Sequence, residues 1–169
     1  MMWKRNRNEV RSEVEQVTET TDSLTIPLTS GDEPTVWNLE TEPRAEFLGN
    51  IVEAYGNIAN HVAKHSEELD YYAFDLNHEL VKEDEPVSRL ALTEHEAWDL
   101  SVALVQEMAA RKDSEEKFKK IVVVINGLEI LNNQEPEDAD LYQQFRGYMR
   151  TVQAEGADHG IHLMFAAKA

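Results

Sequence analysis

Positions 121–125 read Ile-Val-Val-Val-Ile, an unbroken run of β-branched residues. Continuous apolar runs of this kind are typical of a central strand in a parallel sheet, which is buried on both faces. Neighbouring parallel strands cannot be joined by tight hairpins and need crossover connections, which are usually helices. The run therefore predicts a domain in which strands and helices alternate.

The remaining sequence patterns agree with such an alternation. We expect strands at 35–39, 71–75, 87–91, 121–125 and 161–167, and amphipathic helices at 43–64, 93–111 and 139–154. Pro43 suits the first turn of a helix, and Thr93 forms a capping-box pattern with Glu96. The expected fold class is α/β, a three-layer αβα domain with a mainly parallel sheet. In such sheets a ligand site lies beyond the carboxyl ends of the strands.

The composition excludes several classes of protein. Acidic residues number 33 against 16 basic ones, a formal charge of −17, which argues against binding of nucleic acid or of an anionic membrane surface. The chain has no cysteine, so it has no disulfide, zinc–thiolate site or cysteine nucleophile. No apolar run approaches the ~20 residues of a membrane-spanning helix. We therefore expect a cytoplasmic domain that does not itself insert into a membrane.

The 169 residues are enough for one domain with its own core. Residues 1–23 begin with several basic side chains and continue as a stretch rich in Glu, Thr and Ser, with few apolar side chains to bury. We interpret residues 1–23 as a flexible linker or docking arm and residues 24–169 as the domain.

The order of the elements resembles the FtsK/SpoIIIE-type P-loop ATPases. Residues 120–127, Lys-Ile-Val-Val-Val-Ile-Asn-Gly, resemble the Walker B strand of that family, and residues 160–168 resemble its next core strand. The resemblance implies a RecA-like P-loop NTPase fold. Domains of that family continue beyond this last strand, so the resemblance implies either a C-terminally truncated domain or a shortened relative of the family. A truncated sheet would have an unpaired edge or exposed apolar surface.

The phosphate-binding residues of the family are replaced. A working loop, G-x-x-x-x-G-K-[ST], wraps phosphates with backbone N–H groups and uses its Lys and hydroxyl for phosphate and Mg²⁺. Aligned with residues 38–45, this chain has Asn38, Thr41 and Pro43 for glycines, Arg44 for the Lys and Ala45 for the hydroxyl residue. The carboxylates of Glu40 and Glu42 would also repel a triphosphate.

The other catalytic positions are replaced as well. Asn126 aligns with the Asp that organises Mg²⁺, Gly127 with the catalytic Glu, and Ala167 with the Thr of the family's Thr-Gln pair. Asp75 ends a strand where it either lines the former nucleotide pocket or caps a loop. Together these nine positions (38, 41, 43, 44, 45, 75, 126, 127 and 167) form a vestigial nucleotide pocket, with no catalytic residue, no metal site and no bound ATP.

The resemblance implies a pseudo-ATPase, similar to the degenerate modules of the membrane-anchored motor of type VII protein secretion, the EssC/EccC kind. Its expected partners are neighbouring ATPase domains of the same motor and secreted helical-hairpin substrates. Its role would be substrate recognition or regulation of those domains. Two alternatives remain open: an ATPase domain that binds nucleotide weakly through divergent Walker motifs, and an unrelated acidic α/β scaffold for a small ligand.

Overall fold

A computed structural model of the chain describes residues 22–29, 32–80, 87–127 and 139–167. The predicted arm at residues 1–23 lies outside this part, apart from its last two residues. In chain order the described elements are β1 (Thr25–Pro27), β2 (Val36–Asn38), β3 (Ala45–Leu48), α2 (Ile51–Lys64), β4 (Leu69–Asp75), β5 (Arg89–Ala91), α3 (Glu94–Lys112), β6 (Lys120–Asn126), α5 (Ala139–Glu155), the short 3-10 helix η2 (Gly156–His159) and β7 (Ile161–Ala167).

Five strands form one parallel sheet in the order β3-β7-β6-β4-β5. The β-branched run forms β6, which pairs with β4 on one side and β7 on the other, and its five residues are buried. Strand β3 is at one edge and β5 at the other. The expected α/β class and the central position of residues 121–125 are thus confirmed.

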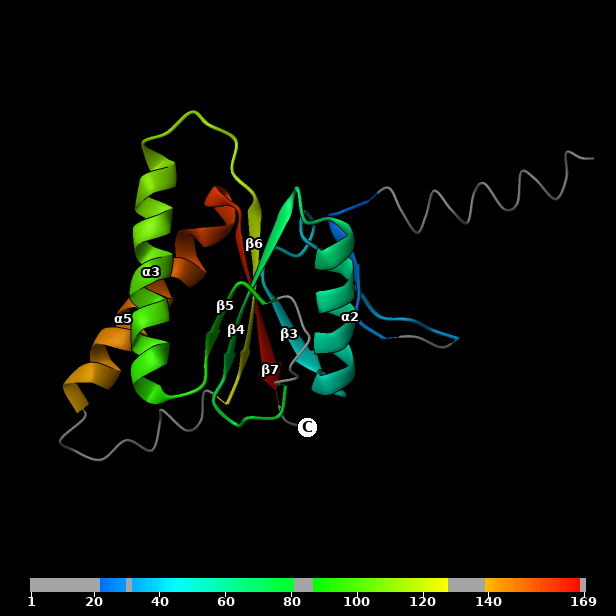
Figure 1. The fold of residues 1–169 in the computed structure, drawn as a ribbon, viewed down its shortest axis with the longest axis horizontal. Helices are drawn as coiled ribbons and strands as arrows, with labels where there is room; N and C mark the ends of the chain where they lie inside the picture. Colours follow the sequence, from blue (N-terminus) through cyan, green and yellow to red (C-terminus); the bar gives the residue numbers. More distant parts are fainter. Residues whose placement is uncertain (1–21, 30–31, 81–86, 128–138, 168–169) are drawn as a thin grey trace, which may run out of the picture.

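Helices cover both faces of the sheet, giving the expected three layers (Figure 1). Helix α2 lies on one face, and the apolar core there also takes in the small antiparallel sheet of β1 and β2 through Ile26 and Trp37. Helices α3 and α5 lie on the other face, where Leu104 and Phe145 pack against β6 and β7. No helix among the described residues is long and apolar enough to cross a bilayer.

Two sequence-based expectations about the start of the domain are wrong in part. The strand expected at 35–39 is present as β2, but it lies outside the parallel sheet and pairs with β1. The helix expected at 43–64 starts only at Ile51, and its first part is the edge strand β3. Phe47 and Leu48 lie four and three positions before Ile51, which is the spacing of apolar residues on one face of a helix. In the sequence they therefore look like part of α2, and the strand is not recognised.

The helix starts at Ile51 because Asn50 caps it. The Asn50 side-chain oxygen accepts hydrogen bonds from Val52 N at 3.1 Å and Glu53 N at 3.2 Å. Upstream of the cap, Ala45 and Phe47 are buried while Glu46 and Leu48 are exposed. This alternation with a period of two residues is that of a strand with one covered face.

Candidate functional site

The carboxyl ends of the parallel strands meet at one edge of the sheet, where this kind of fold places its ligand sites. Asp75 at the end of β4 pairs in register with Asn126 at the end of β6, and Gly127 follows directly. At the end of β7, Ala167 pairs with Leu48 of β3. The structure thus brings Asp75, Asn126 and Gly127 together, and it places Ala167 at the same edge.

The Asp75 carboxylate is fully buried and organises the loop that follows β4. Its two oxygens accept hydrogen bonds from the backbone N–H groups of Glu79 and Leu80, both at 3.0 Å. The Asn126 amide donates a further bond to the same carboxylate at 3.3 Å. Of the two roles considered for Asp75, these contacts are those of a loop cap.

Asn126 acts at this edge as a donor. Its amide nitrogen lies 3.3 Å from Asp75 Oδ1 and 3.5 Å from Glu79 Oε1, and its backbone carbonyl accepts from Leu76 N at 3.0 Å. A Mg²⁺ ligand must offer an oxygen lone pair, whereas this amide directs its N–H groups at the neighbouring carboxylates. The arrangement joins the ends of β4 and β6 through a polar network.

Gly127 has a backbone conformation that only glycine adopts without strain, with φ of +92°. A Cβ atom there would lie 2.8 Å from Asn77 N and 3.0 Å from Leu76 Cβ. The position that aligns with the catalytic Glu of the family therefore has no room for a side chain.

The junction between β3 and α2 corresponds to the strand–loop–helix unit that holds phosphate in P-loop proteins. Here only Gly49 and Asn50 separate the strand from the helix. A loop of the form G-x-x-x-x-G-K-[ST] does not fit between them. The Asn50 cap also occupies the N–H groups of Val52 and Glu53, which an anion at the helix N-terminus would use. Sequence reasoning overlooked this junction, although an Asn just before an apolar helical period is a recognised start signal.

Residues 38–45 therefore do not form the loop between a core strand and a helix, and that part of the alignment is wrong. Asn38 shapes a turn after β2, since its side-chain oxygen accepts from Glu40 N at 2.9 Å and Thr41 N at 3.2 Å. Pro43 and Arg44 are exposed in the segment before β3. Ala45 begins β3 opposite Met164, and Leu48 is the β3 residue at the carboxyl edge.

His162 of β7 holds the segment before β3 against the sheet. Its Nδ1 donates to the Pro43 carbonyl at 3.1 Å, and its side chain is 2% exposed. The other ring nitrogen, Nε2, is buried without a hydrogen-bond partner among the described residues. Burial lowers the pKa of His162 below its ordinary value of 6.5, because the charged ring loses its solvation in the core; the positive charge of Lys120 acts in the same direction, and the hydrogen bond to Pro43 opposes it.

We expect the free energy of unfolding to fall as the pH drops below 6.5. Above that value His162 is neutral in both states; below it the unfolded chain binds a proton first, so stability falls as the pH approaches the lowered folded-state pKa. The pKa of His61 is also lowered by burial and adds a change of the same sign. Urea unfolding between about pH 7.5 and 5.5 measures the effect, in a range where most carboxylates stay ionised.

The matched variants for this measurement are His162→Gln and His95→Gln. The first should weaken the acid dependence. The second should leave it intact, because the His95 side chain is 75% exposed. An acid dependence that is the same in His162→Gln as in the unaltered protein would contradict the role of His162.

His61 and His65 lie one helical turn apart on α2, with ring centroids 4.5 Å from each other. His61 donates through Nε2 to the Ser23 carbonyl at 2.9 Å, which connects α2 to the residues just before β1. Within the described ranges, no group of three or more His, Asp or Glu side chains is placed to hold a metal ion.

Comparisons with known proteins connect this geometry to a fold. No family model matches the sequence, and no curated protein matches it either. Among solved structures, the conjugation coupling protein TcpA of pCW3, determined with ATPγS, superposes on 87% of this chain with a TM-score of 0.67 and 19% identity. EccC (ATPases 2 and 3) of Thermomonospora curvata, in complex with a signal sequence peptide, covers 90% of it with a TM-score of 0.65 and 15% identity.

The chain has the α/β fold of these P-loop ATPase domains. This confirms at the level of fold the resemblance to FtsK/SpoIIIE-type and EccC/EssC-type domains. EssC (ATPases 2 and 3) of Geobacillus thermodenitrificans is also similar, with a TM-score of 0.55, 15% identity and 86% of this chain covered. The chain spans 49% of the TcpA structure, 30% of the EccC structure and 33% of the EssC structure, so it corresponds to a part of each.

Proposed function

We propose that this chain is a non-catalytic ATPase-like domain of a protein secretion motor, of the type VII kind, that acts through protein–protein contacts. The observation that carries the proposal is the junction of Gly49 and Asn50 between β3 and α2. A phosphate cradle needs several backbone N–H groups that converge from a glycine-rich loop, with a Lys that reaches the phosphates. This junction has neither the length nor the Lys.

The polar groups beyond β4 and β6 support the same proposal. Asp75 already accepts hydrogen bonds from two backbone N–H groups and one amide. Asn126 and Gly127 offer neither a carboxylate for Mg²⁺ nor a general base for water. At this carboxyl edge of the sheet, where an active domain has its catalytic residues, the polar side chains stabilise the loop that follows β4.

What remains for such a domain is binding. EccC has been determined in complex with a signal sequence peptide, so a domain of this fold occurs in a protein that binds a peptide segment. We infer that this chain likewise contacts neighbouring ATPase domains or a secreted helical substrate, on the cytoplasmic side of a membrane-anchored motor.

Thermal unfolding with millimolar ATP, ADP or ATPγS, each with and without Mg²⁺, tests the non-catalytic half of the proposal. A nucleotide at 100 times its Kd would add about 2.7 kcal/mol of stability. For a domain of this size that is a rise in Tm of several degrees, roughly 5–10 °C. We expect no rise that depends on nucleotide.

Two controls keep the melting experiment specific. MgCl₂ alone and NaCl at equal ionic strength are needed, because cations stabilise a chain of charge −17 by screening its self-repulsion. A rise seen only with nucleotide and Mg²⁺ together would overturn the proposal and favour a weak ATPase with divergent motifs. Binding of a type VII signal sequence peptide, followed by fluorescence anisotropy, would support the substrate-recognition role.

A further inference from the structure

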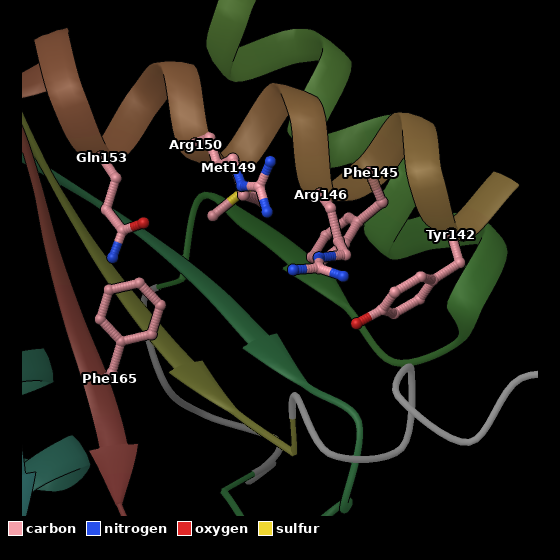
Figure 2. Close-up of a pocket in the computed structure, with 7 residues that line it drawn as sticks. All are labelled: Tyr142, Phe145, Arg146, Met149, Arg150, Gln153 and Phe165. Carbon is pink, nitrogen blue, oxygen red and sulfur yellow. The ribbon is translucent and has the colours of Figure 1, made fainter. Parts of the chain in front are cut away.

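A groove lies between α5 and β7 (Figure 2), on the face of the sheet opposite α2. Its Phe165 pairs in register with Ile125, so the groove lies close to the carboxyl ends of the strands. Its volume is about 330 Å³. The side chains that line it come from two elements: Tyr142, Phe145, Arg146, Met149, Arg150 and Gln153 of α5, and Phe165 of β7.

The bottom of the groove is apolar. Phe145 and Met149 are buried in the core between α5 and the sheet, and Phe165 is half-buried beside them. Leu48 of β3 projects from the same face as Phe165, because Glu46 pairs with Phe165 and side chains alternate along the strand. The Leu48 side chain is 64% exposed, so the apolar surface continues uncovered onto the edge strand.

The rim on the α5 side is cationic. Arg146 and Arg150 are exposed, and in the view of Figure 2 their guanidinium groups lie between Phe165 and Tyr142. The Arg146 guanidinium is 5.6 Å from the centre of the Tyr142 ring. Within the described part of the chain, neither arginine forms an ion pair with a carboxylate.

Arg146 and Arg150 form a local cationic pair in a chain with 33 acidic and 16 basic residues. Two arginines one helical turn apart present guanidinium forks that match carboxylates. On the opposite wall, Glu46 lies beside Phe165. The field across the groove therefore favours a ligand whose carboxylates face α5 and whose apolar side chain lies over Phe165 and Leu48.

We propose that this groove binds an acidic segment of another polypeptide, with an apolar anchor side chain seated on Phe165 and flanking carboxylates paired with Arg146 and Arg150. The inference rests on the proposed function, since it names the chemistry of a protein partner for a domain that acts by contact. An apolar anchor in a pocket, surrounded by charge pairs at the rim, is the usual arrangement of an interface with one strong contact.

A second copy of this chain is a poorer occupant, because two molecules with a formal charge of −17 repel each other over their whole surfaces. A short segment brings far fewer negative charges, and the two arginines can pair those that flank the anchor side chain. The proposal therefore commits to an acidic segment from a different polypeptide.

The probe is a fluorescent peptide, Glu-Glu-Leu-Phe-Glu-Glu, followed by anisotropy, with Lys-Lys-Leu-Phe-Lys-Lys as the charge-reversed comparison. We expect the acidic peptide to bind and the basic peptide not to displace it. Affinity should fall when NaCl is raised from about 0.1 M to about 1 M, because the Debye length shrinks from about 10 Å to about 3 Å.

The decisive variants are Arg146→Glu and Arg150→Glu, alone and combined. Both positions are exposed, so the fold should be retained, which the melting curve checks. Each single charge reversal should lower the affinity for the acidic peptide about tenfold or more, since each replaces a charge-assisted pair with a repulsion. The matched control is Arg89→Glu on β5, at the other edge of the sheet, which makes the same change in net charge and should leave affinity unchanged.

Several results would overturn the inference. These are absence of binding by the acidic peptide at millimolar concentration, equal loss in Arg89→Glu, or unchanged affinity in the double reversal. Displacement of the peptide by Mg²⁺-free ATP would also overturn it, because the groove would then be a site for anionic nucleotides. If the acidic peptide does not bind in the groove and nucleotide does not raise the Tm, the proposed function stands. The protein contacts of this domain would then lie on another surface.

Discussion

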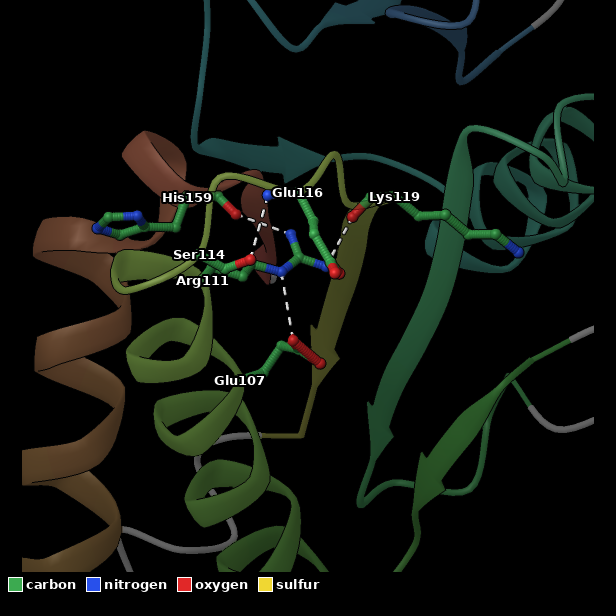
Figure 3. Close-up of polar contacts among 6 residues, drawn as sticks. All are labelled: Glu107, Arg111, Ser114, Glu116, Lys119 and His159. Atoms are coloured by element: carbon green, nitrogen blue, oxygen red, sulfur yellow. Dashed lines mark hydrogen bonds and ion pairs between the residues drawn. The ribbon is translucent and has the colours of Figure 1, made fainter.

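Arg111→Ala should lower the free energy of unfolding by about 3–5 kcal/mol. Arg111 lies in the last turn of α3, and its side chain is 6% exposed. It donates through Nη1 to the His159 carbonyl and through Nη2 to the Lys119 carbonyl, each at 2.7 Å (Figure 3). Its Nε lies 3.4 Å from Glu107 Oε2.

These contacts join three parts of the domain at the amino end of the sheet. Lys119 precedes β6 and His159 precedes β7, so one guanidinium fastens α3 to the entry of two core strands. The guanidinium carbon of Arg111, Cζ, also lies 5.0 Å from the centre of the Phe118 ring. Truncation leaves two backbone carbonyls without their donor, and a hydrogen bond to a charged group contributes about 1.5–3 kcal/mol.

Thermal and urea unfolding measure the loss, which corresponds to a fall in Tm of roughly 6–20 °C. Arg111→Lys is the informative intermediate. An ammonium keeps the charge but cannot bridge both carbonyls and Glu107, so it should recover only part of the stability. Lys112→Ala is the control, since the neighbouring ion pair with Glu155 is exposed and its removal should cost a small fraction of the Arg111 loss. Equal effects of Arg111→Ala and Lys112→Ala would contradict the role of Arg111.

Arg111 also marks a limit of sequence reasoning. A basic residue in the last turn of a helix is common because it complements the helix dipole, so its presence carries no signal. Its two carbonyl partners lie 8 and 48 positions away along the chain. Only the packing of α3 against the strand entries reveals that its side chain is buried.

The central strands could be predicted because burial on both faces leaves a direct trace in the sequence. Residues 121–125 have no polar member, and 161–167 have one, His162. The edge strand β3 leaves a weaker trace, since only Ala45 and Phe47 face the core. For this reason residues 45–48 are included in the predicted helix. The phosphate loop is also aligned with residues 38–45, upstream of the junction between β3 and α2.

The candidate site was predictable in part for the same reason. Asp75, Asn126 and Gly127 follow from the ends of well-marked strands, and the structure brings them together. The hydrogen bonds that make Asp75 a loop cap come from Glu79 and Leu80, whose backbone direction no local pattern reveals. The role of Asn50 was readable as a capping signal, but only once the strand before it is recognised.

Asn126→Asp, which restores the carboxylate of an active Walker B strand, should destabilise the domain by about 2–4 kcal/mol near neutral pH without producing nucleotide hydrolysis. The introduced carboxylate would take the place of an amide that lies 3.3 Å from Asp75 Oδ1 and 3.5 Å from Glu79 Oε1. Asn126 is buried, so water cannot screen the repulsion that results.

The loss should depend on pH with a definite sign. Burial and like charge raise the pKa of the introduced carboxyl group above its unfolded value, so the folded variant keeps a proton that the unfolded chain has lost. The deficit relative to the unaltered protein is then largest near neutral pH and shrinks as the pH falls through the raised pKa. Urea unfolding of both proteins over that range measures the difference.

Asn50→Asp is the matched control, because it makes the same chemical change at the N-cap of α2, where a carboxylate accepts the same N–H groups and is favoured by the helix dipole. It should be neutral or slightly stabilising. The contrary result for Asn126→Asp is a variant of unchanged stability that Mg²⁺ stabilises well beyond equal ionic strength of NaCl. In such a variant the strand end would bind a metal ion after a single substitution. The polar network of Asp75, Glu79 and Asn126 would then be a metal site that lacks one ligand, and its role would not be only to hold the loop after β4.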